Sequence, residues 1–249
     1  MELLLIILIA FLVALIFSML GLGGAIIYTP LFFWIGLPIL TAIPMALLLN
    51  AITTISASIT YLRRHLVDTG IAYPIIATSV PGALIGSYLA RKVDTEFIII
   101  LLSMILFLAG TRMLFFNSIG LLLKIDRKQK TIVGVLTGFL IGLISSMVGV
   151  GGGSFIVPLL LMFGSETKKA IATSSFIITF IALSGFLGHV SFGDQQMDIT
   201  MLLSAGTAAF LGAQIGSRVI FKRTSSRTIE HMFALVLILV VGKLVYGLL

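Results

Sequence analysis

Two glycine-rich motifs hold the residues whose spacing is best suited to binding a ligand. They read Ser18-Met-Leu-Gly21-Leu-Gly23-Gly24 and Ser146-Met-Val-Gly149-Val-Gly151-Gly152-Gly153-Ser154. A helix that restarts after such glycines has first N–H groups without intrahelical partners, and these carry partial positive charge. Two helix starts facing one cavity would attract an anion without a buried lysine or arginine, and the serines could add hydroxyl donors. The alternative is that the glycines only let helices cross closely.

Polar side chains inside apolar runs form the second group of candidates. They are Asn50, Thr53 and Thr54, followed in the second half of the chain by Thr173, Ser174, Ser175, His189 and Gln214. Polar residues within a membrane are functional candidates by default, although serine and threonine hydroxyls also bond back to their own helix. His189 is expected either to contact the anion or gate it, or to be an ordinary interfacial residue. Together with the two motifs, these residues form the predicted substrate site.

Catalysis and metal binding are not expected. The sequence contains no cysteine, and its three histidines, His65, His189 and His231, are far apart. No Ser–His–Asp set and no pair of carboxylates lies within an apolar run. We therefore expect a protein that is not an enzyme and that has no metal and no cofactor.

The composition indicates an integral membrane protein. Hydrophobic residues make up 59% and charged residues 10% of the 249 residues, whereas soluble domains have about 25% charged residues. The basic residues form short clusters between apolar runs, a pattern that indicates membrane orientation and argues against nucleic-acid binding. Helical segments are expected over 2–19, 25–36, 41–62, 71–90, 97–116, 131–148, 153–163, 169–190, 198–221 and 229–248. The second segment of each half is too short to cross alone.

The two halves of the chain correspond to each other. The glycine motifs repeat at an offset of 128 residues, as do Pro30 and Pro158, and the Gly-x-x-x-Gly-Ser sequences that begin at Gly82 and Gly212 repeat at 130. This duplication predicts a first transmembrane repeat over 1–120, a charged cytoplasmic linker over 121–130 and a second repeat over 131–249.

The distribution of basic residues indicates whether the chain crosses the membrane at the glycine motifs or doubles back there. If 2–36 and 131–163 each cross once, eight lysines and arginines lie on either side. If the chain doubles back at the glycines, only Arg91, Lys92 and Lys243 oppose the other thirteen, as the positive-inside rule prefers. The predicted fold is therefore an all-α polytopic membrane protein of two inverted repeats, with five helical elements each and both termini outside the cytoplasm.

With these motifs, the chain resembles the sulfite exporter TauE/SafE family, also called the toluene-sulfonate uptake permease family. The resemblance rests on the paired glycine motifs, the prolines that follow them and the paired Gly-x-x-x-Gly-Ser sequences. It implies an inner-membrane permease, most readily an exporter, for sulfite or sulfonates such as sulfoacetate. A passive anion channel and a permease for organic acids without sulfur are the alternatives. The expected partners are a small anion and the lipid bilayer, with no nucleic acid, and a homodimer is left open.

Overall fold

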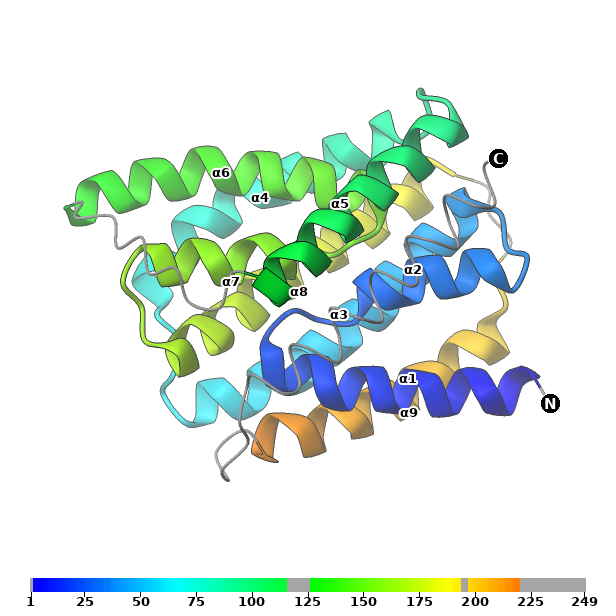
Figure 1. Ribbon diagram of the computed structural model, residues 1–249, viewed down its shortest axis with the longest axis horizontal. Coiled ribbons are helices and arrows are strands. Elements are labelled where there is room, and N and C mark those ends of the chain that lie inside the picture. The colour runs from blue at the N-terminus through cyan, green and yellow to red at the C-terminus, as the bar shows by residue number, and fades with distance from the viewer. Residues whose placement is uncertain (1, 116–125, 194–196, 220–249) are drawn as a thin grey trace.

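Helices make up the regular structure of the residues that the structure describes. The computed structural model describes residues 2–115, 126–193 and 197–219. Within these ranges it has no strand, and its helices are α1 (Glu2–Leu20), α2 (Ala25–Trp34), α3 (Ile39–Arg63), α4 (Thr69–Leu89), α5 (Thr95–Phe115), α6 (Arg127–Val148), α7 (Gly153–Met162), α8 (Thr167–Ser191) and α9 (Ile199–Val219) (Figure 1). The all-α prediction is confirmed. The segment expected over 229–248 lies outside the described residues.

Five of these helices are long and apolar enough to cross a membrane, by length and composition: α3, α4, α6, α8 and α9. Helices α2 and α7 have 10 residues each, or about 15 Å, and so cannot cross alone. Large apolar side chains face outward along the long helices, including Leu136 and Leu140 on α6 and Leu203 and Leu211 on α9. Such a surface needs lipid around it, so the chain is a polytopic membrane protein.

The chain doubles back at both glycine motifs. In the first half, Gly24 lies beside Asn50 in the middle of α3, and one turn later Tyr28 Oη already reaches the carbonyl of Ala10 on α1 at 3.0 Å. In the second half, Lys130 Nζ near the start of α6 donates to the carbonyl of Phe163, just after α7, at 2.6 Å. Helices α2 and α7 therefore run back along the helices that precede them, as the charge count predicts (Figure 1).

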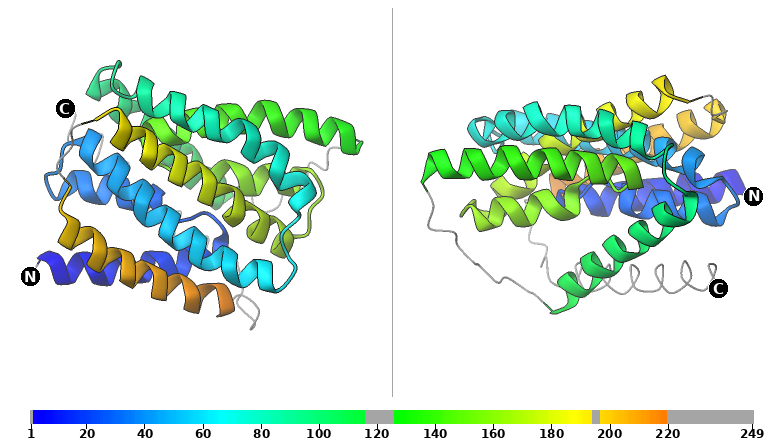
Figure 2. Two further views of the ribbon diagram at one scale, coloured as in Figure 1. Left: turned by 180° about the vertical axis from the view of Figure 1, so that it is seen from behind. Right: turned by 90° about the horizontal axis from the view of Figure 1, so that it is seen from above.

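The two halves interlock. The first helix of each half packs against the fourth helix of the other, so α1 pairs with α9 and α6 pairs with α4 (Figure 2). A Cβ added at Gly216 would overlap the carbonyl of Leu15, and one added at Gly86 would overlap the carbonyl of Leu143. The helices touch backbone to backbone there, which is the packing expected of small-x-x-x-small spacing.

Equivalent helices of the two halves run in opposite directions. The central pair, α3 and α8, shows this directly: Gly185 near the end of α8 lies against Leu47 near the start of α3. At the other end of the pair, Ile171 packs in one cluster with Ala57 and Tyr61. Contacts of Phe11 with Gly212 and of Leu15 with Gly216 make α1 parallel to α9. The contacts of α3 with α9, and those of α4 with α6 and α8, are parallel in the same way, so α1, α3 and α9 share one direction and α4, α6 and α8 share the opposite one.

These directions sort the positive charges. One end of the bundle, called the basic end here, carries Arg63, Arg64, Lys128, Lys130, Lys168, Lys169 and Arg218. Arg91 and Lys92 lie at the opposite end, together with the start of α1, which is marked N in Figure 1.

One helix boundary differs clearly from the prediction. Helix α6 begins at Arg127, inside the segment expected to be a linker over 121–130. Gln129 Oε1 accepts a hydrogen bond from the N–H of Asp126 at 3.0 Å, which is half of a capping box. The charged residues therefore start the helix, although their charge alone suggested a linker.

Candidate functional site

The two glycine motifs meet at Asn50. Its Oδ1 accepts hydrogen bonds from the N–H of Gly24 at 2.6 Å and of Ala25 at 3.1 Å, so it caps the start of α2. A Cβ at Gly23 would overlap this oxygen, and one at Gly151 would overlap Nδ2 of the same amide. Both glycines also have positive φ, +68° and +77°, where other residues are strained. Gly21–Gly24, Gly149–Gly152 and Asn50 are called the glycine crossing below.

The crossing is closed and braced from several helices. A Cβ at Gly153 would overlap the carbonyl of Leu22, so the two reversals touch through their backbones. Thr29 on α2 donates to the carbonyl of Gly149 at 2.5 Å, and Ser174 on α8 donates to the carbonyl of Gly21 at 2.9 Å. Each turn is thereby held by the opposite half of the chain.

Four predicted site hydroxyls bond back to their own helices. Ser18 donates to Leu15, Thr53 to Leu49, Thr54 to Asn50 and Ser175 to Ile171, in each case to the main-chain carbonyl. Their hydrogens are therefore already engaged in the closed structure. In these four residues the hydroxyl thus bonds back to its own helix, which is the alternative to a role in binding.

Two further candidates hold helices together. Gln214 Nε2 donates to the carbonyl of Ser56 at 2.8 Å and so ties α9 to α3. Thr173 Oγ1 accepts from the N–H of Asp68 at 2.9 Å, which fixes the connection between α3 and α4 to α8. Neither contact reaches the amide of Asn50.

His189 is buried rather than interfacial. Its side chain is 0% exposed, and Nε2 lies 3.0 Å from the carbonyl of Ser146 in the second glycine motif. Because a carbonyl only accepts, Nε2 carries the hydrogen. Nδ1 and the hydroxyl of Ser146 find no partner among the described residues. His189 thus attaches the end of α8 to the second reversal and keeps one ring nitrogen uncommitted.

Sequence reasoning missed Ser145. Its hydroxyl is buried, lies beside Gly152 and has no hydrogen-bond partner in the described part of the chain. At the 128-residue offset it corresponds to Phe17, so a comparison of the two motifs passes over it. The feature of the sequence that could have identified Ser145 is its position directly before the second motif.

No carboxylate in the described part of the chain lies at the crossing. Every aspartate and glutamate in the described ranges lies at or beyond a helix end, and within those ranges no group of acidic or histidine side chains could hold a metal ion. The crossing instead offers amide, hydroxyl and helix-start N–H groups. Such a set suits an anion.

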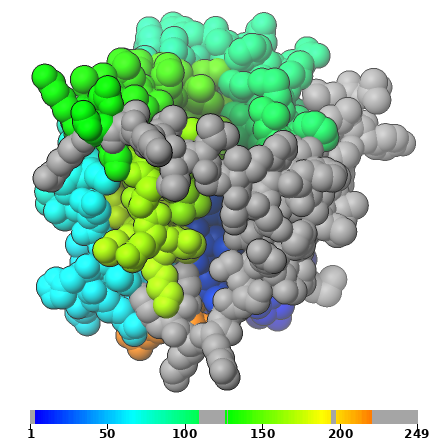
Figure 3. Space-filling view, turned by 60° about the vertical axis from the view of Figure 1, so that its left-hand side comes forward, coloured from blue at the N-terminus to red at the C-terminus, as the bar shows by residue number. Residues whose placement is uncertain are grey.

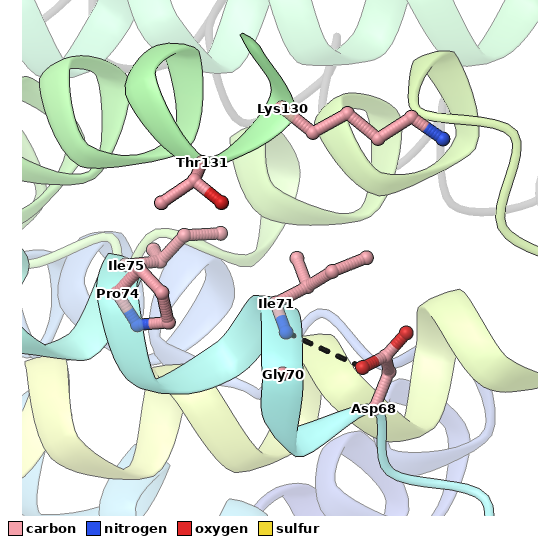
Figure 4. Close-up of a pocket in the computed structure, with 7 residues that line it drawn as sticks. All are labelled: Asp68, Gly70, Ile71, Pro74, Ile75, Lys130 and Thr131. Atoms are coloured by element: carbon pink, nitrogen blue, oxygen red, sulfur yellow. Dashed lines mark hydrogen bonds between the residues drawn. The ribbon is translucent and has the colours of Figure 1, made fainter. Parts of the chain in front are cut away.

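A separate cavity of about 280 Å³ opens at the basic end. There the α3–α4 connection, the start of α6 and the α7–α8 connection lie side by side (Figure 3). The residues that line it are Asp68, Gly70, Ile71, Pro74 and Ile75 from the start of α4, with Lys130 and Thr131 from α6 (Figure 4). Asp68 caps α4 through the N–H of Ile71 at 3.3 Å. Asp68 is hydrogen-bonded to Thr173, next to the Ser174 that holds the first reversal, but no residue of the crossing lines the cavity.

Membrane-crossing helices that surround two touching re-entrant breaks define the class of this protein: an α-helical membrane transporter. Its family follows from sequence comparison. The chain belongs to the sulfite exporter TauE/SafE family, whose profile matches residues 6–244.

Curated relatives match this chain over different shares of their length. A probable membrane transporter protein of Bacillus subtilis, YunE, is 26% identical over 92% of each chain. A probable membrane transporter protein of Haemophilus influenzae is 25% identical over 88% of this chain and 89% of its own. The sulfite exporter TauE/SafE family protein 6 of Arabidopsis thaliana is 28% identical over 49% of this chain and 27% of its own. No solved structure matches the chain.

Proposed function

We propose that this protein is a secondary transporter that exports a small oxyanion across the cytoplasmic membrane and binds it at the glycine crossing. The observation that carries the proposal is the meeting of two helix starts with buried, unpartnered donors halfway along α3. Nothing acidic lies there in the described part of the chain. Broken helices whose positive ends point at an anionic group are a recurring design of transporter sites.

Sulfite or an organosulfonate such as sulfoacetate is the proposed substrate. The family name supports this choice, as does the name of the Arabidopsis relative. Sulfite and sulfonate groups are compact and present three oxygens, which suits donors arriving from several helices. A carboxylate presents two oxygens in one plane, so organic acids without sulfur are the second candidate.

The opposed directions of equivalent helices support an inverted pair of repeats in the bilayer. We propose that the basic end faces the cytoplasm, following the positive-inside rule, which puts the N-terminus outside. The C-terminus, also expected outside, lies beyond the described residues. Because the chain has no cysteine, Lys92→Cys and Lys128→Cys each give a single label site. In intact cells an impermeant maleimide should modify only Lys92→Cys, and the reverse pattern would refute this orientation.

A carrier fits the crossing better than an open pore does. Asn50 is 0% exposed, and the backbones of the two reversals are in contact. An ion could not pass continuously through such a centre. The helices must rearrange to release the anion on either side.

Flux into proteoliposomes tests the function. Purified protein should exchange labelled sulfite or sulfoacetate with saturable kinetics, and unlabelled substrate inside the vesicles should accelerate uptake. Acetate and succinate are tested in the same assay as organic acids without sulfur. Linear, unsaturable flux would indicate a channel, and preference for the carboxylates would exclude the sulfur assignment.

A further inference from the structure

The amide of Asn50 has a defined orientation. The N–H groups of Gly24 and Ala25 can only donate, so they must face Oδ1, at 2.6 and 3.1 Å. Nδ2 therefore points to the other side, against Gly151 of the second motif. It is fully buried and has no hydrogen-bond partner within the described ranges. One side chain thus satisfies the first reversal and presents two free hydrogens to the second.

The two helix starts at the crossing are not equivalent. Helix α2 is capped by Asn50, whereas no side chain in the described part of the protein accepts a hydrogen bond from the first N–H groups of α7. The residue that corresponds to Asn50 in the second half is Ile178, at the 128-residue offset. An isoleucine cannot accept a hydrogen bond, so the first N–H groups of α7 are left without the cap that α2 has.

Unpartnered groups gather at this uncapped start. Nδ2 of Asn50 lies against Gly151, and the hydroxyl of Ser145 lies beside Gly152. No protein partner for the N–H groups of Gly153 and Ser154 is found among the described residues. Buried polar groups are normally hydrogen-bonded, so several donors that find no protein partner indicate a ligand that supplies the acceptors.

We propose that the transported anion binds only at the start of α7, one anion per chain, and that α2 is a fixed brace. The inference rests on the proposed function and narrows its site. The anion's negative charge lies against the N–H groups of Gly153 and Ser154, and its oxygens accept hydrogen bonds from Asn50 Nδ2 and Ser145 Oγ. A ligand with several acceptor oxygens and no donor fits this set, as sulfite and sulfonate anions do.

Asn50→Asp separates the two roles of the amide. A carboxylate still caps α2, but it replaces the donating Nδ2 with a negatively charged acceptor. Calorimetric titration of the purified protein with sulfoacetate, in mildly alkaline buffer, should show affinity about 100-fold weaker than wild type. Cooperative thermal unfolding without ligand shows that the variant folds, at a temperature lowered by the buried charge. Ser58→Ala, which removes another buried unpartnered hydroxyl from the same helix, should leave the affinity unchanged.

Ile178→Asn tests the site without altering any residue in it. By the correspondence of the halves, the new amide should cap α7 as Asn50 caps α2 and so compete with the anion. We expect affinity about 10-fold weaker, the size of one hydrogen bond. If Asn50→Asp does not fold, the affinity of Ile178→Asn alone tests whether the anion binds at the start of α7.

The outcomes separate the site from the function. One anion per wild-type chain, with weaker binding in both variants, supports the α7 site. Two equal anions per chain, or wild-type affinity in both variants, overturn it and leave transport standing. A wild-type protein that neither binds nor transports sulfite or sulfoacetate overturns the proposed function itself.

Discussion

At the residue scale, the proposed anion site depends on Asn50 and the two glycines that enclose its amide. A threonine or serine on the same helix can satisfy itself by bonding one turn back, as Thr53 and Thr54 do. Asn50 cannot do this for all its groups, so its Oδ1 caps a helix and its Nδ2 faces Gly151. The special position of Asn50 is therefore a consequence of its chemistry.

Gly151→Ala should damage the crossing more than backbone strain alone explains. Left-handed backbone costs a residue with a Cβ about 1–2 kcal/mol, and overlap with the held Asn50 amide adds about 1–3 kcal/mol. Gly36 is a matched control, because it has φ +93° and none of the described residues lies within 4 Å of an added Cβ. The thermal unfolding temperature in detergent should thus fall further for Gly151→Ala than for Gly36→Ala. Anion binding should be lost only in Gly151→Ala. Equal effects would show that strain alone matters.

At the element scale, close contact between helices fixes the frame around the crossing. A Cβ at Gly86 on α4 would meet the backbone of Leu143 on α6, whereas one at Gly134 on α6 would meet side-chain atoms of Ile75 and Phe163. Alanine favours a helix over glycine by up to about 1 kcal/mol. We expect Gly134→Ala to be neutral or stabilising and Gly86→Ala to lower the unfolding temperature. If the two variants unfold alike, the glycines are not packing devices.

Sequence reasoning could find most helices and both reversals, because apolar runs and the placement of Lys and Arg depend on the bilayer itself. It could not find which helices pair. The contact of α1 with α9 joins residues about two hundred positions apart, such as Leu15 and Gly216. It also missed Ser145, and it could not decide that Asn50 caps α2, because both depend on where distant backbone lies. The start of α6 likewise depends on a capping contact, the hydrogen bond from the N–H of Asp126 to Gln129.

At the scale of the whole molecule, the sequence repeats are not separate bodies. Because α1 packs on α9 and α6 packs on α4, moving one half against the other would break both glycine contacts. In the proposed carrier, alternating access is achieved by keeping the α1–α9 and α4–α6 pairs and α2 in place and moving α7, the short helix whose start binds the anion. Each short helix is bounded by the crossing at one end and by a loop at the other.

Locating the bound anion tests the central claim most directly. Selenite resembles sulfite in shape and charge, and selenium gives an anomalous signal in crystals of the protein grown with it. The account predicts one peak per chain, with oxygens within about 3 Å of the first N–H groups of α7 and of Asn50 Nδ2. A peak only in the cavity beside Lys130, or equal peaks at the starts of α2 and α7, would contradict it.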